Sequence, residues 1–573
     1  MAETLISPGV LARENDQSQV TSQPITVGAA IIGPTVKGPV EIPTIVTSYS
    51  QYQNTFGTTF LSGSNVYTYF TSIAAYNYFN NGGQSLLVAR VVSGSYTPAI
   101  STAISSSTQA ASQPAFVLET LSEGVIANSS SSLDASGALL SGSPDNIRWQ
   151  IVNPNTSSGT FDLLIRQGND NTNNPIVLET WTNLSLDPTA ANFVAAVIGD
   201  SVQNYNSTLN QITVSGSYPN QSRYVRVKSV NNLTPFYFDN NGVAKSQYTA
   251  SIPLAASGSF TGASGDPVAA AGNKYYNEII AGVTNVQGLV AGDYTNMVAL
   301  LANQDDYRFN VMLTPGLIDS GAFSTPVTSI ISNTQNRGDS IYVVDQNPYN
   351  STVGNAVTAA ATRNTSYAAT YWPWLMTVDP DSGQRVWVPA STMIGGVYAF
   401  NDSVAEPWFA PAGINRGGLA TVIRAEQKLP QSSRDTLYSG NVNPIATFPG
   451  TGVVVYGQKT LQKQASALDR VNVRRLLIAL KSYISQVANN LVFEQNTIAT
   501  RNQFLSQVNP YLESVQQRQG LYAFKVIMDD SNNTADVIDR NQLVGQIYIQ
   551  PTKTAEFIYL DFNILPTGAT FPA

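Results

Sequence analysis

The sequence contains no cysteine and no histidine in 573 residues. Without cysteine, the chain has no disulfide bonds, no thiolate metal ligands and no thiol nucleophiles. Without histidine, it has no imidazole metal ligands and no catalytic triad that depends on an imidazole base. These two absences exclude most common enzyme mechanisms.

Charged residues are also scarce, at 12% of the chain, and the formal net charge is -8. A protein that coats nucleic acid needs clustered Lys and Arg to neutralise phosphates. We therefore expect no direct binding of nucleic acid, and any basic contact has to be local.

Long apolar runs are missing as well. No uncharged apolar run approaches the roughly 18 residues that a membrane-spanning helix needs. The opening residues, MAETLISPGVLAREND, lack the charged region and the apolar core of a signal peptide. We expect a protein that is made soluble in the cytoplasm and that does not insert into membranes.

What is present describes a folded chain. Hydrophobic residues make up 43% of the sequence, with 41 glycines and 30 prolines. This length corresponds to about three or four compact units, each able to bury a core. The composition favours a strand-rich and loop-rich protein.

Two distant stretches have the strand, helix, strand order of an α/β unit. The first, residues 25–92, runs from ITVGAAIIG through an aromatic amphipathic segment, 66–79, to SLLVARVV. The second, residues 273–399, contains FNVMLTP, a predicted helix over 323–333 and SIYVVD. Together they predict one discontinuous α/β middle domain.

Residues 93–272 separate these halves and differ from them in composition. They are rich in Ser, Thr, Asn and Gly, and contain short alternating runs such as FDLLIR and YVRVKSV. This pattern predicts a mainly β surface insertion, since loop tips tolerate insertions best. Residues 1–24 are polar and interrupted by proline, and we interpret them as an extended arm.

A helix with two distinct sides is predicted from Asp469 to about Val492. Apolar residues recur at helical spacing and give one face; they are Val473, Leu476, Leu480, Ile484, Val487 and Leu491. Beside them lies a basic stripe, made of Arg470, Arg474 and Lys481, with Arg475 further round the helix. Two interpretations stay open: a solvated flank, or a docking surface for an acidic partner.

Three patterned strands follow this helix: LYAFKVIM from Leu521, VGQIYIQ from Val544 and EFIYLDFNIL from Glu556. In the last run, Ile558, Leu560, Phe562 and Ile564 share one face, as a half-buried strand requires. A three-stranded sheet leaves two open edges, and exposed edges pair readily with another chain. The N-terminal arm is a candidate for that pairing.

Two segments imitate cofactor motifs. GVVVYGQKT, from Gly452, approaches a phosphate-binding loop, but its lysine comes one residue too late, and we predict a strand and turn. DPDSGQ, from Asp379, resembles the start of a calcium loop, but lacks the third acidic ligand and the bidentate glutamate. We expect no cofactor and no metal.

Several long blocks, in order, resemble the contractile phage tail sheath proteins. In the C-terminal region they are FNDSVAEPWFAPAGINRGGL from Phe400, YGQKTL from Tyr456, DRVNVRRLLIALKSYI from Asp469 and NNTADVIDRNQLVGQIYIQP from Asn532. The opening LISPGVLARE, and VLETWTNLSLDP from Val177, are similar to the larger, multi-domain sheath proteins of myovirus type.

The resemblance implies an α+β multi-domain protein with a conserved α/β sheath core, N- and C-terminal strand extensions and a mainly β inserted domain. It implies a virion tail component, assembled in the host cytoplasm as a helical polymer of hexameric rings. Its implied partners are further copies of the chain, the tail tube protein, and baseplate and tail terminator proteins.

The resemblance also assigns roles to residues. Residues 400–573 are expected to face the tube. The arm is expected to join this domain in a neighbouring subunit. The expected strand-exchange positions are Leu5, Ile6, Val10, Leu11, Ile558, Leu560, Phe562 and Ile564. The candidate tube contacts are Arg470, Arg474, Arg475 and Lys481.

Three alternatives stay open. Paired carboxylates such as Asp305 and Asp306 are enough for glycosidase chemistry, which needs no histidine, although adjacent aspartates point in different directions. The Ser/Thr/Asn-rich insertion is compatible with a β-rich adhesin. A sheath from a headless contractile injection particle would carry the same C-terminal blocks.

Overall fold

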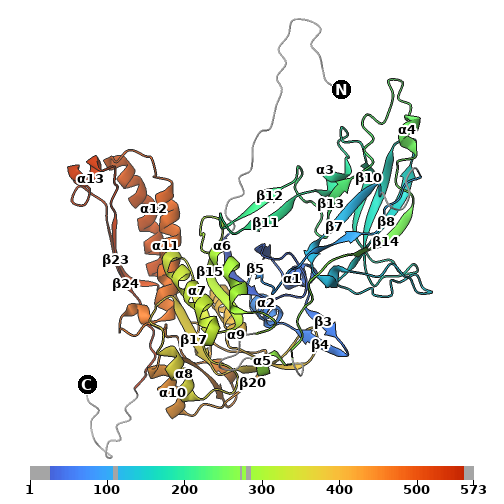
Figure 1. The fold of residues 1–573 in the computed structure, drawn as a ribbon. Helices are drawn as coiled ribbons and strands as arrows, with labels where there is room; N and C mark the ends of the chain where they lie inside the picture. Colours follow the sequence, from blue (N-terminus) through green and yellow to red (C-terminus); the bar gives the residue numbers. More distant parts are fainter. Residues whose placement is uncertain (1–25, 108–113, 271–273, 279–285, 560–573) are drawn as a thin grey trace, which may run out of the picture.

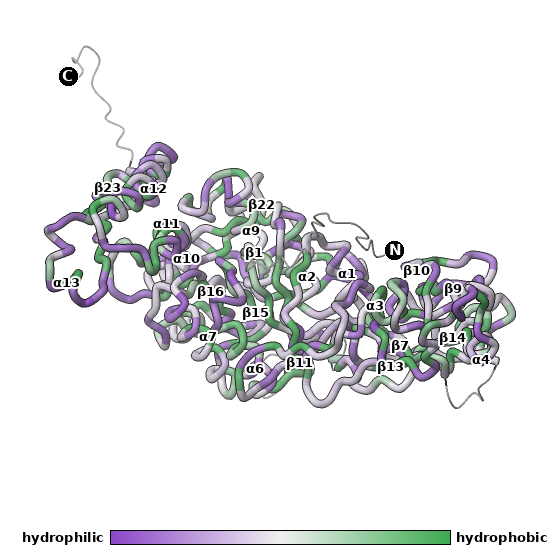
Figure 2. Tube along the Cα trace, turned by 90° about the horizontal axis from the view of Figure 1, so that it is seen from above, coloured by the Kyte–Doolittle hydropathy of each residue, from purple (hydrophilic) through white to green (hydrophobic). Residues whose placement is uncertain are grey.

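The computed structural model describes residues 26–107, 114–270, 274–278 and 286–559. It shows mixed helices and sheets in several units. A central α/β unit lies between a β-rich unit and a C-terminal helical unit, and the three follow one another in a row (Figures 1 and 2). The arm expected over residues 1–24 lies outside the described residues.

The central unit is built on an eight-stranded sheet with the order β2-β5-β1-β15-β16-β17-β21-β22. Ala29 of β1 lies opposite Leu86 of β5 on one side and Val311 of β15 on the other, so the sheet joins segments from before and after the β-rich unit. The strands span β1 Thr26–Gly33, β2 Thr44–Val46, β5 Leu86–Arg90, β15 Arg308–Ile318, β16 Ile341–Asp345, β17 Ala368–Trp372, β21 Asn443–Phe448 and β22 Gly452–Val455.

Strands β1, β5, β15, β16, β17 and β21 are parallel, and antiparallel strands, β2 and β22, form both edges. Parallel strands are buried on both faces, which explains their nearly continuous apolar sequences. The boundary expected between residues 399 and 400 is wrong for this sheet, because Asn443 of β21 pairs with Tyr371 of β17. That boundary is where the sheath-like sequence blocks begin, at Phe400, and strand pairing does not follow those blocks.

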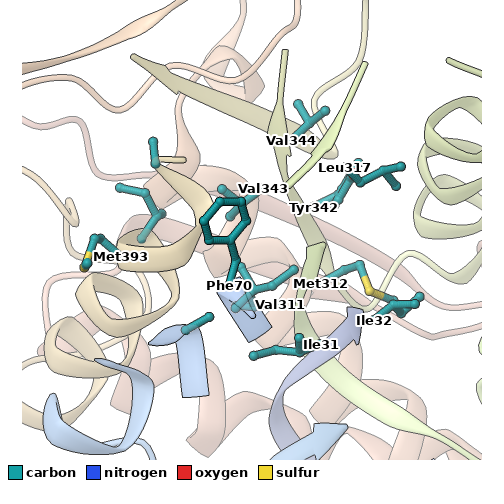
Figure 3. Packing of buried hydrophobic residues seen from close by; sticks show 14 of the residues in the cluster. Ile31, Ile32, Phe70, Val311, Met312, Leu317, Tyr342, Val343, Val344 and Met393 are labelled. Atoms are coloured by element: carbon teal, nitrogen blue, oxygen red, sulfur yellow. The ribbon is translucent and has the colours of Figure 1, made fainter. Parts of the chain in front are cut away.

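Helices cover both faces of this sheet. Helices α2 (Phe70–Asn80) and α9 (Ser391–Val404) pack on the face of Ile31, Val311 and Val343 (Figure 3). The opposite face, with Ile32 and Met312, meets α6 (Thr295–Leu300) and α7 (Ser324–Arg337). The other helices of this unit are α1 Tyr49–Phe56, α5 Tyr275–Glu278, α8 Val353–Ala360 and α10 Gln431–Ser439.

Glycine permits the close packing of α2 on α9. A Cβ at Gly396 would lie 2.7 Å from the carbonyl oxygen of Asn77, and one at Gly395 would lie 2.5 Å from the Leu313 side chain. Two small antiparallel sheets complete this unit. They are the hairpin of β3 (Thr59–Ser62) with β4 (Asn65–Thr68), and β19 (Arg385–Val388), β18 (Leu375–Val378) and β20 (Val422–Ala425).

The β-rich unit contains a seven-stranded antiparallel sheet in the order β10-β9-β8-β14-β6-β7-β13. Its core holds Trp149, Phe116 and Phe161, all almost fully buried. The strands are β6 Pro98–Ser101, β7 Phe116–Glu123, β8 Ile147–Asn155, β9 Thr160–Gln167, β10 Val177–Ser185, β13 Val225–Val230 and β14 Ala256–Thr261. A hairpin, β11 Val202–Asn206 with β12 Gln211–Ser215, and two helices, α3 Val194–Ile198 and α4 Ser246–Thr249, accompany the sheet.

Polar contacts join the β-rich unit to the central unit. The buried Arg90 guanidinium donates to the carbonyl oxygens of Gly38 and Glu123, and Lys37 pairs with Asp145 at 3.0 Å. The bond from Arg90 to Glu123 joins the end of β5 to the end of β7, and the Lys37–Asp145 pair is a second link between the two units.

The C-terminal unit has a separate apolar core. Two long helices, α11 (Val471–Asn489) and α12 (Ile498–Gln517), pack together, and α12 packs against β23 (Leu521–Ile527). Strand β24 (Gln546–Pro551) pairs with β23, and the short helix α13 (Ala535–Asp539) lies between them in sequence. Of the third strand expected from Glu556, residues 556–559 are described and are not in a strand, and the rest of that run lies outside the described residues.

Candidate functional site: the basic helix and the C-terminal strands

Helix α11 forms where the periodicity predicts it. Leu476, Leu480 and Val487 are buried against Val508 and Leu512 of α12. Leucines at this spacing lie on one side of a helix, and their burial stabilises it. Figure 1 shows α11 between α12 and the central unit, so the helix has neighbours on two sides.

The central unit, on the other side of α11 from α12, accounts for the position of Arg474. This residue is only 4% exposed, and its guanidinium donates to Ser366 Oγ. Its Cζ lies 4.0 Å from the centre of the Tyr367 ring, in the geometry of a cation–π contact. Burial lowers the pKa of Arg474 from its ordinary value.

Arg475 is buried in a second polar pocket of the central unit. It is 3% exposed, donates to Asp402 at 2.5 Å and lies 4.7 Å from the centre of the Tyr398 ring. Burial would lower its pKa, but the carboxylate of Asp402 outweighs that effect and the pKa is raised. The guanidinium therefore stays charged and joins α11 to α9.

The expected basic stripe is thus wrong as an exposed surface. Arg474 and Arg475 point into the central unit, because the helix face beside the apolar face is covered by residues around Ser366 and Asp402. Lys481 is exposed, with its Nζ 3.5 Å from the Tyr367 hydroxyl. Of the four candidate tube contacts, Lys481 and the partly exposed Arg470 have accessible side chains.

Arg470 takes part in a cluster that we call the Glu556 clasp: Tyr438, Gln458, Arg470 and Glu556. The Glu556 carboxylate accepts hydrogen bonds from the Tyr438 hydroxyl at 2.6 Å, Arg470 Nε at 2.8 Å and Gln458 Nε2 at 3.0 Å. Burial alone would raise the pKa of Glu556, but these three bonds outweigh burial and lower it. The clasp holds the start of the C-terminal segment against the central unit.

The strand pair β23–β24 is left incomplete by the described part of the chain. It is a two-stranded sheet, and residues on both strands are exposed, including Tyr522 at 62% and Tyr548 at 55%. Such a pair has two outer edges whose backbone groups have no strand beside them. An isolated two-stranded pair is only marginally stable, so further strands would stabilise it.

Apolar residues follow the clasp without any cover. Phe557, Ile558 and Tyr559 are 67%, 76% and 90% exposed. The other predicted strand-exchange positions, Leu5, Ile6, Val10, Leu11, Leu560, Phe562 and Ile564, lie outside the described residues. The three exposed residues therefore lead into the last part of the predicted exchange strand.

Within the described residues, the chain's own side chains occupy the position of the central sheet where α/β folds bind ligands. Strand order reverses between β1 and β15, and ligands bind at the carboxyl ends of such strands. Here the buried Gln287 accepts from the Phe70 backbone N–H at 2.9 Å and donates to the Pro315 carbonyl oxygen at 3.1 Å. The chain's own side chains fill this position.

The other sequence candidates have structural explanations. Gly452–Val455 is strand β22, as predicted, and Asp379 lies in the turn between β18 and β19, where it accepts from Thr68 Oγ1 at 2.5 Å. Within the described ranges, no group of three or more acidic residues is arranged to hold a metal ion. No helix in the same ranges has the length and apolar character for a membrane crossing.

The fold and these surfaces define a multi-domain α+β protein whose accessible features suit contacts with other chains. Residues 287–461 match the central domain of the phage tail sheath protein, and residues 463–565 match the phage tail sheath C-terminal domain. These two matches make residues 287–461 and 463–565 phage tail sheath domains.

Two relatives are named tail sheath protein. The one from Vibrio phage KVP40 is 39% identical over 255 residues, which covers 44% of this chain and 38% of the relative. The one from Enterobacteria phage T4 is 40% identical over 185 residues, which covers 32% of this chain and 28% of the relative. The matches thus span about a third of the length of these relatives.

A solved structure shares the fold. The crystal structure of a sheath tail protein from Listeria innocua superposes with a TM-score of 0.52 at 10% identity, over 92% of this chain and 95% of that one. The likeness extends over all three units.

Sequence reasoning missed the Glu556 clasp. Its residues are far apart in sequence: Tyr438 and Glu556 are 118 positions apart, and Arg470 and Glu556 are 86 positions apart. No local pattern connects them. The one available signal was an acidic residue placed immediately before an alternating apolar run.

Proposed function

We propose that this chain is the subunit of a contractile tail sheath. It polymerises as stacked hexameric rings around a tail tube and shortens to drive the tube through a host envelope for genome delivery. The observation that carries this proposal is the incomplete strand pair β23–β24, followed by the uncovered residues Phe557, Ile558 and Tyr559.

Strand exchange completes the pair in the polymer. The arm positions Leu5, Ile6, Val10 and Leu11 add one strand, and the run from Ile558 to Ile564 adds another, each from a neighbouring copy. Strand addition supplies main-chain hydrogen bonds between chains without a deep pocket. Such a linkage suits a polymer whose subunits rotate while remaining attached.

Contraction then follows from a difference between two lattices. Subunits that assemble on the tube are held in an extended lattice, and a signal from the baseplate releases them into a shorter and wider one. The driving force is the difference in contact free energy, and about a few kcal/mol per subunit adds up over a long polymer. Rigid units joined by flexible strand linkages would permit this repacking.

The tail tube, the baseplate and the tail terminator are the proposed partners. The tube faces the C-terminal unit, and the exposed Lys481 is the contact that remains from the predicted basic stripe. Buried Arg474 and Arg475 instead position α11 in the subunit. A headless contractile particle would use the same subunit contacts.

Electron microscopy of the purified protein tests the proposal. The protein is imaged alone at high concentration and then with its tail tube protein. Hollow six-fold tubes, with a different pitch and diameter on the inner tube, are the expected result. Monomers under both conditions would contradict a sheath role and direct attention to glycan binding by the β-rich unit.

A further inference from the structure

The receptor half of the Glu556 clasp is built from ordered elements. Tyr438 belongs to α10, Gln458 follows β22, and Arg470 is the N-cap residue of α11. Lys459 supports this arrangement. Its Nζ donates to the Tyr438 carbonyl oxygen at 2.8 Å and lies 4.5 Å from the centre of the Tyr438 ring. The site for the carboxylate is therefore set by the central unit.

The segment that reaches the clasp is held at more than one point. Thr552 Oγ1 donates to the Gln519 carbonyl oxygen at 2.7 Å, next to β23. Gln458 Nε2 donates to Thr554 Oγ1 at 2.7 Å, and Glu556 enters the clasp two residues later. A chain of this length spans at most about 14 Å, so the segment ties the C-terminal unit to the central unit over a short distance.

The clasp also marks a sharp change in burial. Glu556 has an 18% exposed side chain, whereas Phe557, Ile558 and Tyr559 next to it are largely exposed. Three consecutive uncovered apolar residues need a partner surface. That surface is the open edge of a β23–β24 pair in a second copy, because this chain's segment is already fixed by the clasp.

We propose that Glu556 is a positioning residue that fixes where the C-terminal extension leaves its own subunit. The clasp forms within one chain and remains closed in the polymer, so every subunit presents the residues from Phe557 onward from the same point. Tension on the exchanged strand is passed through the clasp to the central unit. This inference rests on the strand exchange in the proposed function.

Cross-linking tests whether the clasp is intramolecular. The chain has no native cysteine, so thiols introduced by Gln458→Cys and Thr554→Cys are the sole reactive sites. The double variant, treated with a short bifunctional thiol reagent, should link within one chain in monomer and polymer alike. Because Gln458→Cys removes one bond of the clasp, the polymer is formed at raised protein concentration. A mixture of the two single variants should give no linked dimers in the polymer. Linked dimers there would overturn the inference.

The carboxylate itself is tested by Glu556→Gln, which keeps the shape and removes the charge. Loss of a charge-assisted bond should raise the critical concentration for polymerisation by about tenfold. Tyr438→Phe removes one hydrogen bond and should act in the same direction by a smaller factor. If Glu556→Gln folds poorly, Tyr438→Phe still tests whether the clasp contributes to polymerisation. Asp305→Asn, at an exposed loop carboxylate, is the charge-matched control and should assemble as the native chain does.

Deletion of residues 557–573 distinguishes the proposed strand exchange from the inference about the clasp. If this deletion blocks assembly and Glu556→Gln does not, strand exchange stands and the clasp inference fails. If the deletion leaves assembly unchanged, the strand exchange itself fails.

Discussion

The central sheet and the C-terminal strand pair are completed in different ways. The central sheet has eight strands, helices on both faces and buried strands such as β16 and β17. The C-terminal pair has two strands, is covered by α12 and keeps many side chains exposed. In the central sheet six of the eight strands have a strand on each side, whereas within the described residues both strands of the C-terminal pair are edge strands.

This contrast separates folding from assembly. Because its strands pair over long range within the chain, we expect the central unit to fold without neighbours. In the proposed strand exchange, the C-terminal pair supplies the edges through which neighbours attach. Changes in the central unit should therefore alter the stability of the subunit, and changes at the strand extensions should alter assembly.

The largest expected effect comes from deleting residues 2–20. The variant should fold as a monomer with native thermal unfolding but form no stable sheath, because the pair in each neighbour lacks one strand. Sedimentation and electron microscopy measure assembly. Normal assembly by this variant would refute the strand exchange.

Arg475→Ala should act on the subunit itself. The change leaves Asp402 without its cation and removes the contact with Tyr398, so the free energy of unfolding should fall by about 3 kcal/mol. Chemical denaturation measures the change. The control is Arg540→Ala, at the exposed pair with Asp536, which should alter stability by about 0.5 kcal/mol or less. Equal effects of the two variants would show that Arg475 is not a buried anchor.

Protonation of two carboxyl groups should change the stability of the subunit in opposite directions as pH falls. Burial raises the pKa of Asp345 to about 6, so the stability of the native subunit should increase as pH falls from about 6 towards 4. The pKa of Glu556 is lowered, so its contribution is present above its ordinary pKa of 4.5 and is lost as pH falls through the lower folded value.

Thermal unfolding of the dilute monomer between pH 3 and pH 7 separates these two contributions. Asp345→Asn should remove the gain on acidification, and Glu556→Gln should remove the loss at the lowest pH. The same pH profile for both variants would contradict the assignment.

The smallest effect is expected for Lys481→Glu. The side chain is exposed, so stability should stay within about 0.5 kcal/mol of the native value. Binding to the tube should weaken by about threefold, on the scale of one exposed charge pair, and the difference should fade at high salt. Lys463→Glu, at an exposed position before α11, is the matched control. Unchanged tube binding would make Lys481 a solvated residue.

Local patterns predicted many of the elements. The periodicity from Asp469 predicted α11, and the apolar runs around Ala29 and Val311 predicted β1 and β15. Such patterns depend on residues a few positions apart, which is why sequence alone reveals them.

Non-local contacts could not be predicted in this way. Arg474 has the spacing of a surface stripe with Arg470 and Lys481, and Arg475 lies further round the helix. The contacts that bury Arg474 and Arg475 come from Ser366 and Asp402, which are distant in sequence. The run from Glu556 alternates as a strand should, but within the described residues it has no strand to pair with. The pairing of β21 with β17 likewise moved a domain boundary that the sheath-like sequence blocks had suggested.

The central claim is that neighbouring copies complete the β23–β24 pair. The most direct test is a high-resolution electron microscopy reconstruction of the assembled sheath, with attention to the two outer edges of this pair. We predict an added strand from residues 2–20 of one neighbour and another from residues 557–573 of a second. Two unpaired edges in the assembled sheath would contradict the account.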